Sequence, residues 1–115
     1  MKVTYHDPCY LGRYCRLYDI PRELIQSIPG IELIEMERNR MDAWCCGAGG
    51  GVKLGKHDYA AAVGKERVEE AIASTADVLV TACPVCIDNF NDAKEAGKFK
   101  VTIMDIAELL CKALA

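Results

Sequence analysis

Residues 78–86, with the sequence VLVTACPVC, decide the fold of this chain. The first part is rich in apolar and β-branched residues, which is the pattern of a strand covered on both faces of a parallel sheet. Pro84 follows, and proline fits best in the first turn of a helix, so we expect a helix to begin there. A buried strand that leads at once into a helix indicates an α/β architecture.

The alternation of strand and helix extends in both directions from this stretch. Pro29 and Gly30 end one predicted helix and Gly97 ends another, while Asp105 with Glu108 forms a capping-box-like start for the last. The resulting order predicts a single α/β domain over residues 1–115, with a four-stranded, mostly parallel sheet and helices on both faces. The predicted strands are 3–6, 31–36, 78–82 and 101–104, and the predicted helices begin near 21, 58, 84 and 105.

The apolar residues of each predicted helix indicate which face is buried. The charged residues of the second helix, Arg67 among them, are expected mostly on its outer side. The predicted inner faces, in chain order, are Leu24, Ile25 and Ile28; Ala61, Gly64, Val68, Ala71 and Ile72; Ile87, Phe90 and Ala93; and Ile106, Leu109, Leu110 and Ala113.

The composition fits a soluble globular domain. The chain has 115 residues, 51% of them apolar and 27% charged, with a formal net charge of -3, and these values exclude a disordered chain. No apolar run approaches the ~20 residues that span a bilayer, and the mild acidity lacks the basic patch of a nucleic-acid-binding protein. We therefore expect no signal peptide, no nucleic-acid partner and a cytoplasmic location, with any membrane association made through partner subunits.

Cysteine is the unusual component, with seven residues in the chain. Five of them follow predicted strands, and the carboxyl ends of parallel strands meet at one edge of a sheet, where ligands gather. We therefore expect these five thiols at the C-terminal edge of the sheet, whereas Cys15 and Cys111 have the pattern of ordinary buried, small apolar residues. The five are Cys9, Cys45, Cys46, Cys83 and Cys86.

Metal binding explains this set better than disulfides do. Neighbouring cysteines such as Cys45 and Cys46 can pair only in a strained ring, and we expect a reducing compartment because we expect no secretory signal. Zinc would use four thiolates, one fewer than the five available, whereas an iron–sulfur cluster could use all of them. Gly47 lets the backbone approach sulfur closely. Both metals stay open at this point.

The pattern C-x35-CC-x36-C-x2-C, with Gly47 after the cysteine pair, resembles the cysteine-rich CCG domain found in heterodisulfide reductase and in glycolate oxidase iron–sulfur subunits. The resemblance extends over nearly the whole chain. It implies that the five cysteines ligate a [4Fe-4S] cluster of the non-cubane type and that Gly47 belongs to the cofactor-binding loop. Related domains with zinc leave zinc as the alternative cofactor.

The resemblance implies an iron–sulfur redox module of a heterodisulfide-reductase-like oxidoreductase, for disulfide reduction or electron transfer. One alternative is a zinc-stabilised assembly module without catalysis. The other is an electron-transfer subunit of a flavin-linked 2-hydroxy acid or glycerol-3-phosphate dehydrogenase. The chain has one motif where the reductase polypeptide has two, so we expect redox partner subunits or an upstream ferredoxin-like domain, and a disulfide, thiol or small organic substrate. We expect enzyme activity from the chain as a domain or subunit of an iron–sulfur oxidoreductase and not from the chain alone. His6, three residues before Cys9, is the candidate proton donor.

Overall fold

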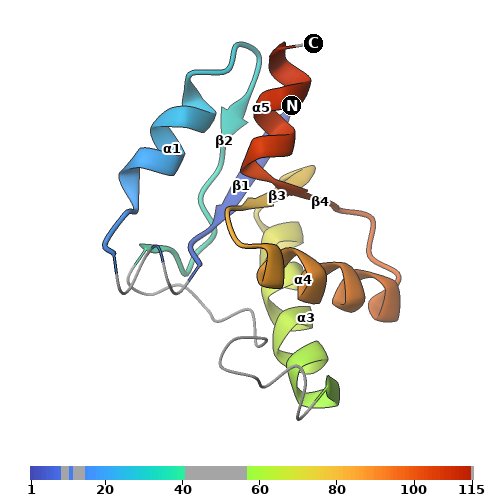
Figure 1. The fold of residues 1–115 in the computed structure, drawn as a ribbon. Helices are drawn as coiled ribbons and strands as arrows, with labels where there is room; N and C mark the ends of the chain where they lie inside the picture. Colours follow the sequence, from blue (N-terminus) through green and yellow to red (C-terminus); the bar gives the residue numbers. More distant parts are fainter. Residues whose placement is uncertain (9–10, 12–14, 41–56, 115) are drawn as a thin grey trace.

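A four-stranded parallel sheet forms the centre of the computed structural model, which describes residues 1–8, 11, 15–40 and 57–114 (Figure 1). The strands are β1 (Lys2–His6), β2 (Glu32–Leu33), β3 (Val78–Thr81) and β4 (Thr102–Asp105). The helices are α1 (Asp19–Gln26), α3 (His57–Ala73), α4 (Pro84–Gly97) and α5 (Ile106–Leu114). The predicted α/β class with a four-stranded parallel sheet is confirmed.

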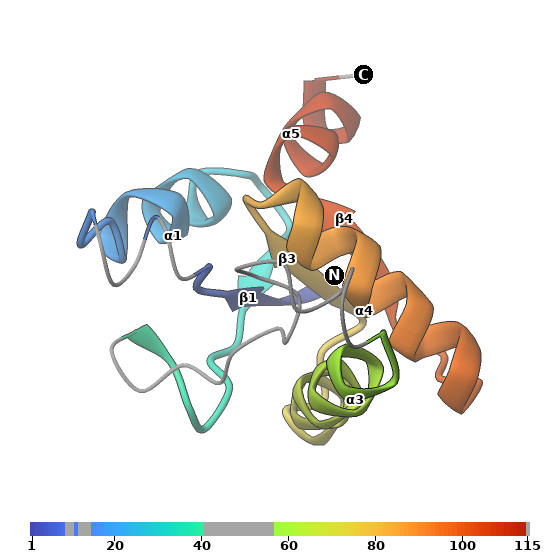
Figure 2. The same ribbon diagram turned by 60° about the horizontal axis from the view of Figure 1, so that its bottom comes forward.

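The strand order in the sheet is β2-β1-β3-β4, and every pair is parallel. β1 and β3 lie side by side at the centre, with Tyr5 opposite Val80 and His6 opposite Thr81. The order reverses between these two strands, because the chain first moves outward to β2 and later returns past β1 to β3. In Figure 2 the molecule is turned so that the carboxyl end of β1 comes toward the reader.

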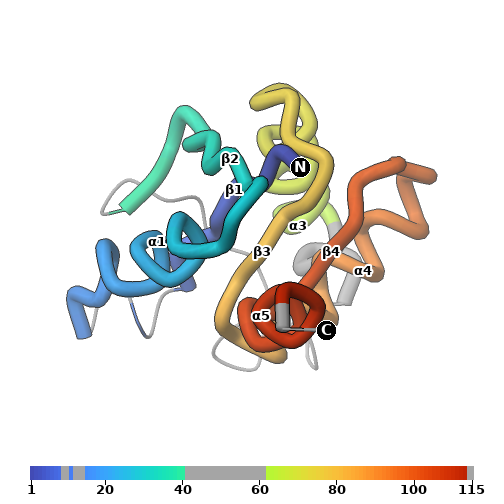
Figure 3. The backbone as a smooth tube through the Cα atoms, turned by 90° about the horizontal axis from the view of Figure 1, so that it is seen from above, coloured from blue at the N-terminus to red at the C-terminus, as the bar shows by residue number. Residues whose placement is uncertain are grey.

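Each face of the sheet has its own apolar core, because successive residues of a strand point to opposite faces. Val78 and Val80 pack on one side with residues of α1 and α5, among them Ile25 and Leu109. Leu79 packs on the other side with residues of α3 and α4, among them Val68, Ala71, Phe90 and Ala93. The view along the sheet in Figure 3 shows these two helix pairs on its opposite sides, as predicted. Each fully buried large apolar side chain contributes roughly 1.5–3 kcal/mol.

Among the predicted inner residues whose burial the structure describes, three are exposed; the side chain of Ala61 lies outside the described residues. Leu24 of α1 is 44% exposed and Ile72 of α3 is 40% exposed, and Ala113 lies exposed in the last turn of α5. In α3 the buried face passes instead through Gly64, Arg67, Val68 and Ala71, so Ile72 is rotated away from the core. The prediction that Arg67 lies on the outer side is wrong, because this residue is fully buried.

Strand β2 is shorter than the predicted segment 31–36, since it is the edge strand and pairs with β1 alone. The pairing ends after Ile34, whose N–H donates to the carbonyl of Val3 at 2.8 Å. The chain then turns away from the sheet, and Met36 enters the core beneath α3 and α4. Residues 35–40 thereby run toward the carboxyl edge of the sheet.

The last helix begins as predicted. The carboxylate of Asp105 accepts from the N–H of Ala107 at 2.8 Å, and the N–H of Asp105 donates to Glu108 at 3.3 Å. These two bonds satisfy donors that a helix start leaves open. In the part of the chain that the structure describes, no helix is long and apolar enough to cross a membrane.

Candidate metal centre

The carboxyl ends of β1 and β3 lie where the strand order reverses. In open parallel sheets this position forms a crevice, because the helices that follow the two strands leave toward opposite faces. Here α1 follows β1 on one side and α4 follows β3 on the other. The hydroxyl of Thr81 donates to the carbonyl of His6 at 3.1 Å and joins the two strand ends.

Two of the five predicted thiol ligands are described, and both are at this edge. Cys83 is half-buried and stands just before α4 in an extended conformation, with φ -126° and ψ 120°. Cys86 lies in the first turn of α4 and is 4% exposed. Pro84 starts the helix between them, and both cysteines are free thiols. The pair therefore places two free thiols at a helix N-terminus.

The remaining cysteines divide into two groups. Cys9, Cys45, Cys46 and Gly47 lie outside the described residues, so their roles stay predictions. Cys15 and Cys111 are both exposed free thiols, and the interpretation of these two as buried apolar residues is therefore wrong.

His6 ends β1 and is 1% exposed. Its Nδ1 accepts a hydrogen bond from Arg67 Nε at 2.8 Å, and its ring meets the ring of Phe90 edge-on, with centroids 4.9 Å apart. Burial lowers the pKa of His6 well below its usual value of 6.5, and the positive charge of Arg67 lowers it further. A neutral imidazole that accepts at Nδ1 carries its proton at Nε2.

Two buried donors of this pair have no partner among the described residues: His6 Nε2 and Arg67 Nη2. The hydroxyl oxygens of Thr4 and Tyr5 share this property. A buried polar group left without a partner costs about 1–3 kcal/mol. Buried donors are nearly always paired, so both N–H groups need an acceptor that the described residues do not supply.

Arg67 was not anticipated as part of the site, although its position three residues after Gly64 and four before Ala71 places it on the apolar stripe of α3. Its Nη1 donates to the carbonyl of Arg38 at 2.7 Å and lies 3.2 Å from a carboxylate oxygen of Glu70. Burial lowers the pKa of Arg67, and Glu70 opposes that shift. Glu70 also accepts from the backbone N–H of Arg38 at 2.7 Å. These bonds hold the segment after β2 against α3.

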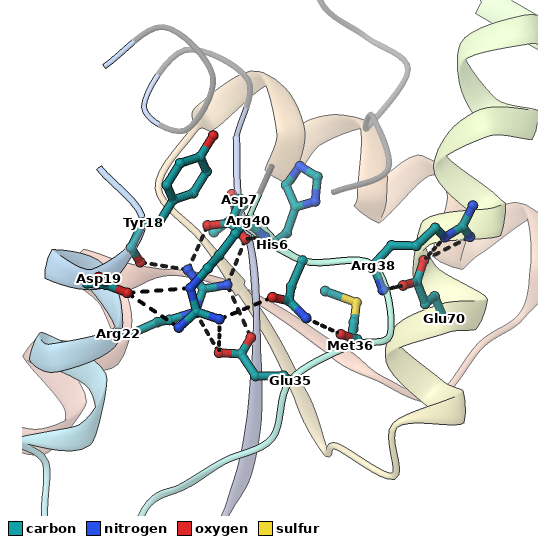
Figure 4. Close-up of polar contacts among 12 residues, drawn as sticks. His6, Asp7, Tyr18, Asp19, Arg22, Glu35, Met36, Arg38, Arg40 and Glu70 are labelled. Atoms are coloured by element: carbon teal, nitrogen blue, oxygen red, sulfur yellow. Dashed lines mark hydrogen bonds and ion pairs between the residues drawn. The ribbon is translucent and has the colours of Figure 1, made fainter. Parts of the chain in front are cut away.

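A second buried arginine, Arg22 on α1, organises the other side of the edge (Figure 4). It donates to both carboxylate oxygens of Asp7 at 2.7 Å and to Glu35 at 2.6 and 3.1 Å. It also donates to the carbonyl of Tyr18 at 2.6 Å. Burial alone would lower the pKa of Arg22, but its bonds with Asp7 and Glu35 raise it above the ordinary value. The guanidinium therefore stays charged.

This network connects two segments that lead toward predicted ligands. Asp7 stands two residues before Cys9, and the backbone N–H of Arg40, five residues before Cys45, donates to the Asp7 carboxylate at 2.7 Å. Figure 4 shows Asp7, Arg22, Glu35 and Arg40 converging from β1, α1 and the segment after β2. A buried bidentate arginine–carboxylate pair has a fixed geometry. The Arg22–Asp7 pair therefore fixes the position of Asp7, and through the bond from Arg40 it also fixes the distance between Asp7 and Arg40.

The chemistry of the described side chains at this edge fits a metal group bound by thiolates. Cys83 and Cys86 are free thiols of the soft-ligand type, and the unpartnered N–H groups of His6 and Arg67 are donors of the kind that surround metal-bound sulfur. The described residues alone contain no cluster of three or more His, Cys, Asp or Glu side chains able to hold a metal.

Comparison with known proteins places these features in a family. A family model described as a cysteine-rich domain, CCG, matches residues 3–91. The chain is 46% identical over 112 residues to one of the polypeptides of the dihydromethanophenazine:CoB–CoM heterodisulfide reductase of Methanosarcina barkeri. That alignment covers 97% of this chain and 27% of the methanogen protein.

Two further relatives carry other names. A probable iron-sulfur-binding oxidoreductase, FadF, of Bacillus subtilis is 42% identical over 97% of this chain and 16% of its own length. One polypeptide of the fumarate reductase (CoM/CoB) of Methanothermobacter marburgensis is 43% identical over 96% of this chain and 22% of its own length. The chain thus spans about a quarter or less of these relatives. On the family match and these identities, it belongs to the cysteine-rich CCG domain family.

Proposed function

We propose that this chain is an iron–sulfur redox module of a heterodisulfide-reductase-like oxidoreductase, in which Cys9, Cys45, Cys46, Cys83 and Cys86 hold a [4Fe-4S] cluster of the non-cubane type. The observation that carries the proposal is the pair of free thiols, Cys83 and Cys86, at the edge where the sheet order reverses. Thiolates are the usual ligands of iron–sulfur clusters. The names of the relatives, which include a heterodisulfide reductase and an iron-sulfur-binding oxidoreductase, support the same chemistry.

The reaction we assign is the reduction of a disulfide by two electrons and two protons to give two thiols. A bound cluster supplies one-electron chemistry at this edge. The residues of the chain contribute the thiolate ligands and a rigid frame, because Arg22 and Arg67 bind the segments around the site in place. The electrons are proposed to come from partner subunits or an upstream ferredoxin-like domain, since the relatives are about four or more times longer than the chain.

The predicted role of His6 as proton donor stays a prediction. Its lowered pKa and its bond from Arg67 favour a neutral imidazole, which holds one proton at Nε2. In this state His6 is better suited to donate a hydrogen bond than to release a proton.

Metal analysis tests the proposal directly. The chain is produced and reconstituted without oxygen, and iron, sulfide and zinc are measured together with the electron paramagnetic resonance spectrum. We expect iron and sulfide in equal amounts. A protein that binds one zinc and no sulfide would overturn the proposal and favour the structural, zinc-stabilised module.

Cysteine variants make the metal analysis specific. Cys83→Ala and Cys86→Ala should lose most of the bound iron, because each removes a proposed ligand. The matched controls, Cys15→Ala and Cys111→Ala, remove exposed thiols and should retain it. Equal iron content in all four variants would contradict the ligand assignment.

Thiol titration separates disulfide reduction from electron transfer. When a thiol substrate is added to the oxidised, loaded chain, a module that acts on disulfides should show a changed resonance spectrum. An unchanged spectrum would leave an electron-transfer module and refute the disulfide reaction.

A further inference from the structure

Two neighbouring N–H donors lie buried at the candidate metal centre without acceptors among the described residues. They are Nε2 of His6, which is 1% exposed, and Nη2 of Arg67, which is fully buried. The two side chains are joined by the bond from Arg67 Nε to His6 Nδ1 at 2.8 Å. Each therefore holds the other in one orientation.

Both open positions require an acceptor. Arg67 has only donors, and its Nε and Nη1 are already used by His6 and by the Arg38 carbonyl. Because Nδ1 of His6 accepts, Nε2 carries the proton. A donor group placed next to Nε2 would therefore find no lone pair there to accept its hydrogen.

The donors lie among the segments that carry the proposed ligands. His6 is three residues before Cys9 in the sequence. It is opposite Thr81, which is two residues before Cys83, and its ring contacts Phe90, one helical turn beyond Cys86. A metal group held by these cysteines would therefore lie near the His6 side chain.

A sulfur anion satisfies this pair better than water does. A buried water typically makes about three hydrogen bonds, so a water that accepted from either donor would still need an acceptor for its own hydrogens. On one side the ring contacts Phe90 edge to face, and the Phe90 side chain has no nitrogen or oxygen acceptor. A metal-bound thiolate or sulfide is an acceptor without hydrogens of its own, and its negative charge suits the guanidinium of Arg67.

We propose that His6 Nε2–H and Arg67 Nη2–H donate hydrogen bonds to sulfur of the bound metal centre and raise its reduction potential. The proposal rests on the iron–sulfur function argued above. Reduction adds negative charge to a cluster, so N–H donors stabilise the reduced form more than the oxidised form. Hydrogen bonds to sulfur are one of the means by which proteins set such potentials.

The first test uses the metal-free, wild-type chain and requires no substitution. Nitrogen-15 spectra of the histidine rings at neutral pH distinguish a proton at Nε2 from one at Nδ1. We expect the His6 proton at Nε2, and a proton at Nδ1 or on both nitrogens would overturn the proposal.

The second test compares midpoint potentials of the reconstituted chain, measured by redox titration followed by electron paramagnetic resonance. His6→Phe keeps an aromatic ring but has no N–H, so its potential should be more negative than that of the wild type. His6→Gln places an amide N–H near the position of Nε2 and should return the potential toward the wild-type value. A chelator should remove iron several-fold faster from His6→Phe than from the wild type. The rate for His6→Gln should return toward the wild-type rate.

Thr4→Val is the matched control. Thr4 is fully buried and lies two residues before His6 on β1, further from the carboxyl edge. Its hydroxyl also has no partner within the described part of the chain. Its replacement should leave the potential unchanged.

The outcomes separate this proposal from the proposed function. Bound iron in the wild type with equal potentials in wild type and His6→Phe would overturn the hydrogen-bond proposal alone. A wild-type chain that takes up no iron would overturn both.

Discussion

Replacement of Arg22 by Met tests whether the buried ion pair with Asp7 holds the site together. The side chains of Arg22 and Asp7 are 4% and 1% exposed, and two bonds of 2.7 Å join them. Met has a similar length but no charge. The variant would therefore leave the Asp7 carboxylate buried, with only the N–H of Arg40 described as a donor to it.

The expected loss follows from this burial. Removing one partner of a buried ion pair costs about 3–5 kcal/mol. Glu35 adds little to this loss, because its side chain is 32% exposed and water can replace the lost bonds. An unfolding entropy of about 2.1 cal/mol/K per residue gives about 0.24 kcal/mol/K for 115 residues. The melting temperature should therefore fall by roughly 12–20 °C.

The assay is equilibrium urea unfolding of the metal-free chain, followed by circular dichroism with chelator and reductant present. Arg40→Met is the control, because the Arg40 and Asp19 side chains are 45% and 75% exposed, and an exposed pair contributes only about 0–1 kcal/mol. Adding Asp7→Asn to Arg22→Met should recover part of the loss, since it removes the unpaired buried charge.

Two results would refute this reasoning. One is a loss below about 1 kcal/mol in Arg22→Met, which would mean that the pair contributes no more than an exposed pair does. The other is the absence of any recovery in the double variant, which would show that the buried charge is not the cause.

Two further predictions concern stability. The unfolding free energy of the metal-free chain should fall as the pH drops below 6.5, by up to about 1.4 kcal/mol per pH unit, because the unfolded chain takes up a proton at His6 that the folded chain, with its lowered pKa, does not. Urea unfolding of wild type and His6→Gln at several pH values checks this, and equal slopes would contradict it. Thr75→Gly should stabilise the chain by about 1 kcal/mol, because a β-branched residue is strained at φ 70°. Thermal unfolding should show a higher melting temperature for Thr75→Gly and no gain for Thr75→Ala.

Elements with strong local signals were predicted closely. Helix α4 begins at Pro84 and ends at Gly97, as the positions of proline and glycine indicated, and Asp105 with Glu108 caps α5. The edge strand β2 was predicted too long, because its length depends on its pairing with β1 and not on its own residues. The prediction that Leu24 and Ile72 are buried rested on helical spacing alone and is wrong. Spacing does not indicate which part of a helix's apolar face is covered by another element.

The candidate site also contains some features that local sequence patterns predicted and others that depend on tertiary contacts. The cysteine pattern predicted the edge at which Cys83 and Cys86 lie, because each follows a strand or begins a helix. The burial of Arg22 and Arg67 was not predictable in this way. Charged residues are almost never buried unless paired, and here the pairing depends in part on residues from distant parts of the chain: Asp7 is 15 positions from Arg22, and His6 is 61 positions from Arg67.

The sequence by itself determined the alternation of strands and helices, the parallel sheet and the spacing of five cysteines, because these depend on residues that are close together along the chain. Only the tertiary structure decided which charged side chains are buried, which nitrogen of His6 is left without an acceptor and which segments Asp7 and Arg22 hold together. Those properties depend on contacts between residues far apart in sequence, and their free energies arise only when folding removes the groups from water.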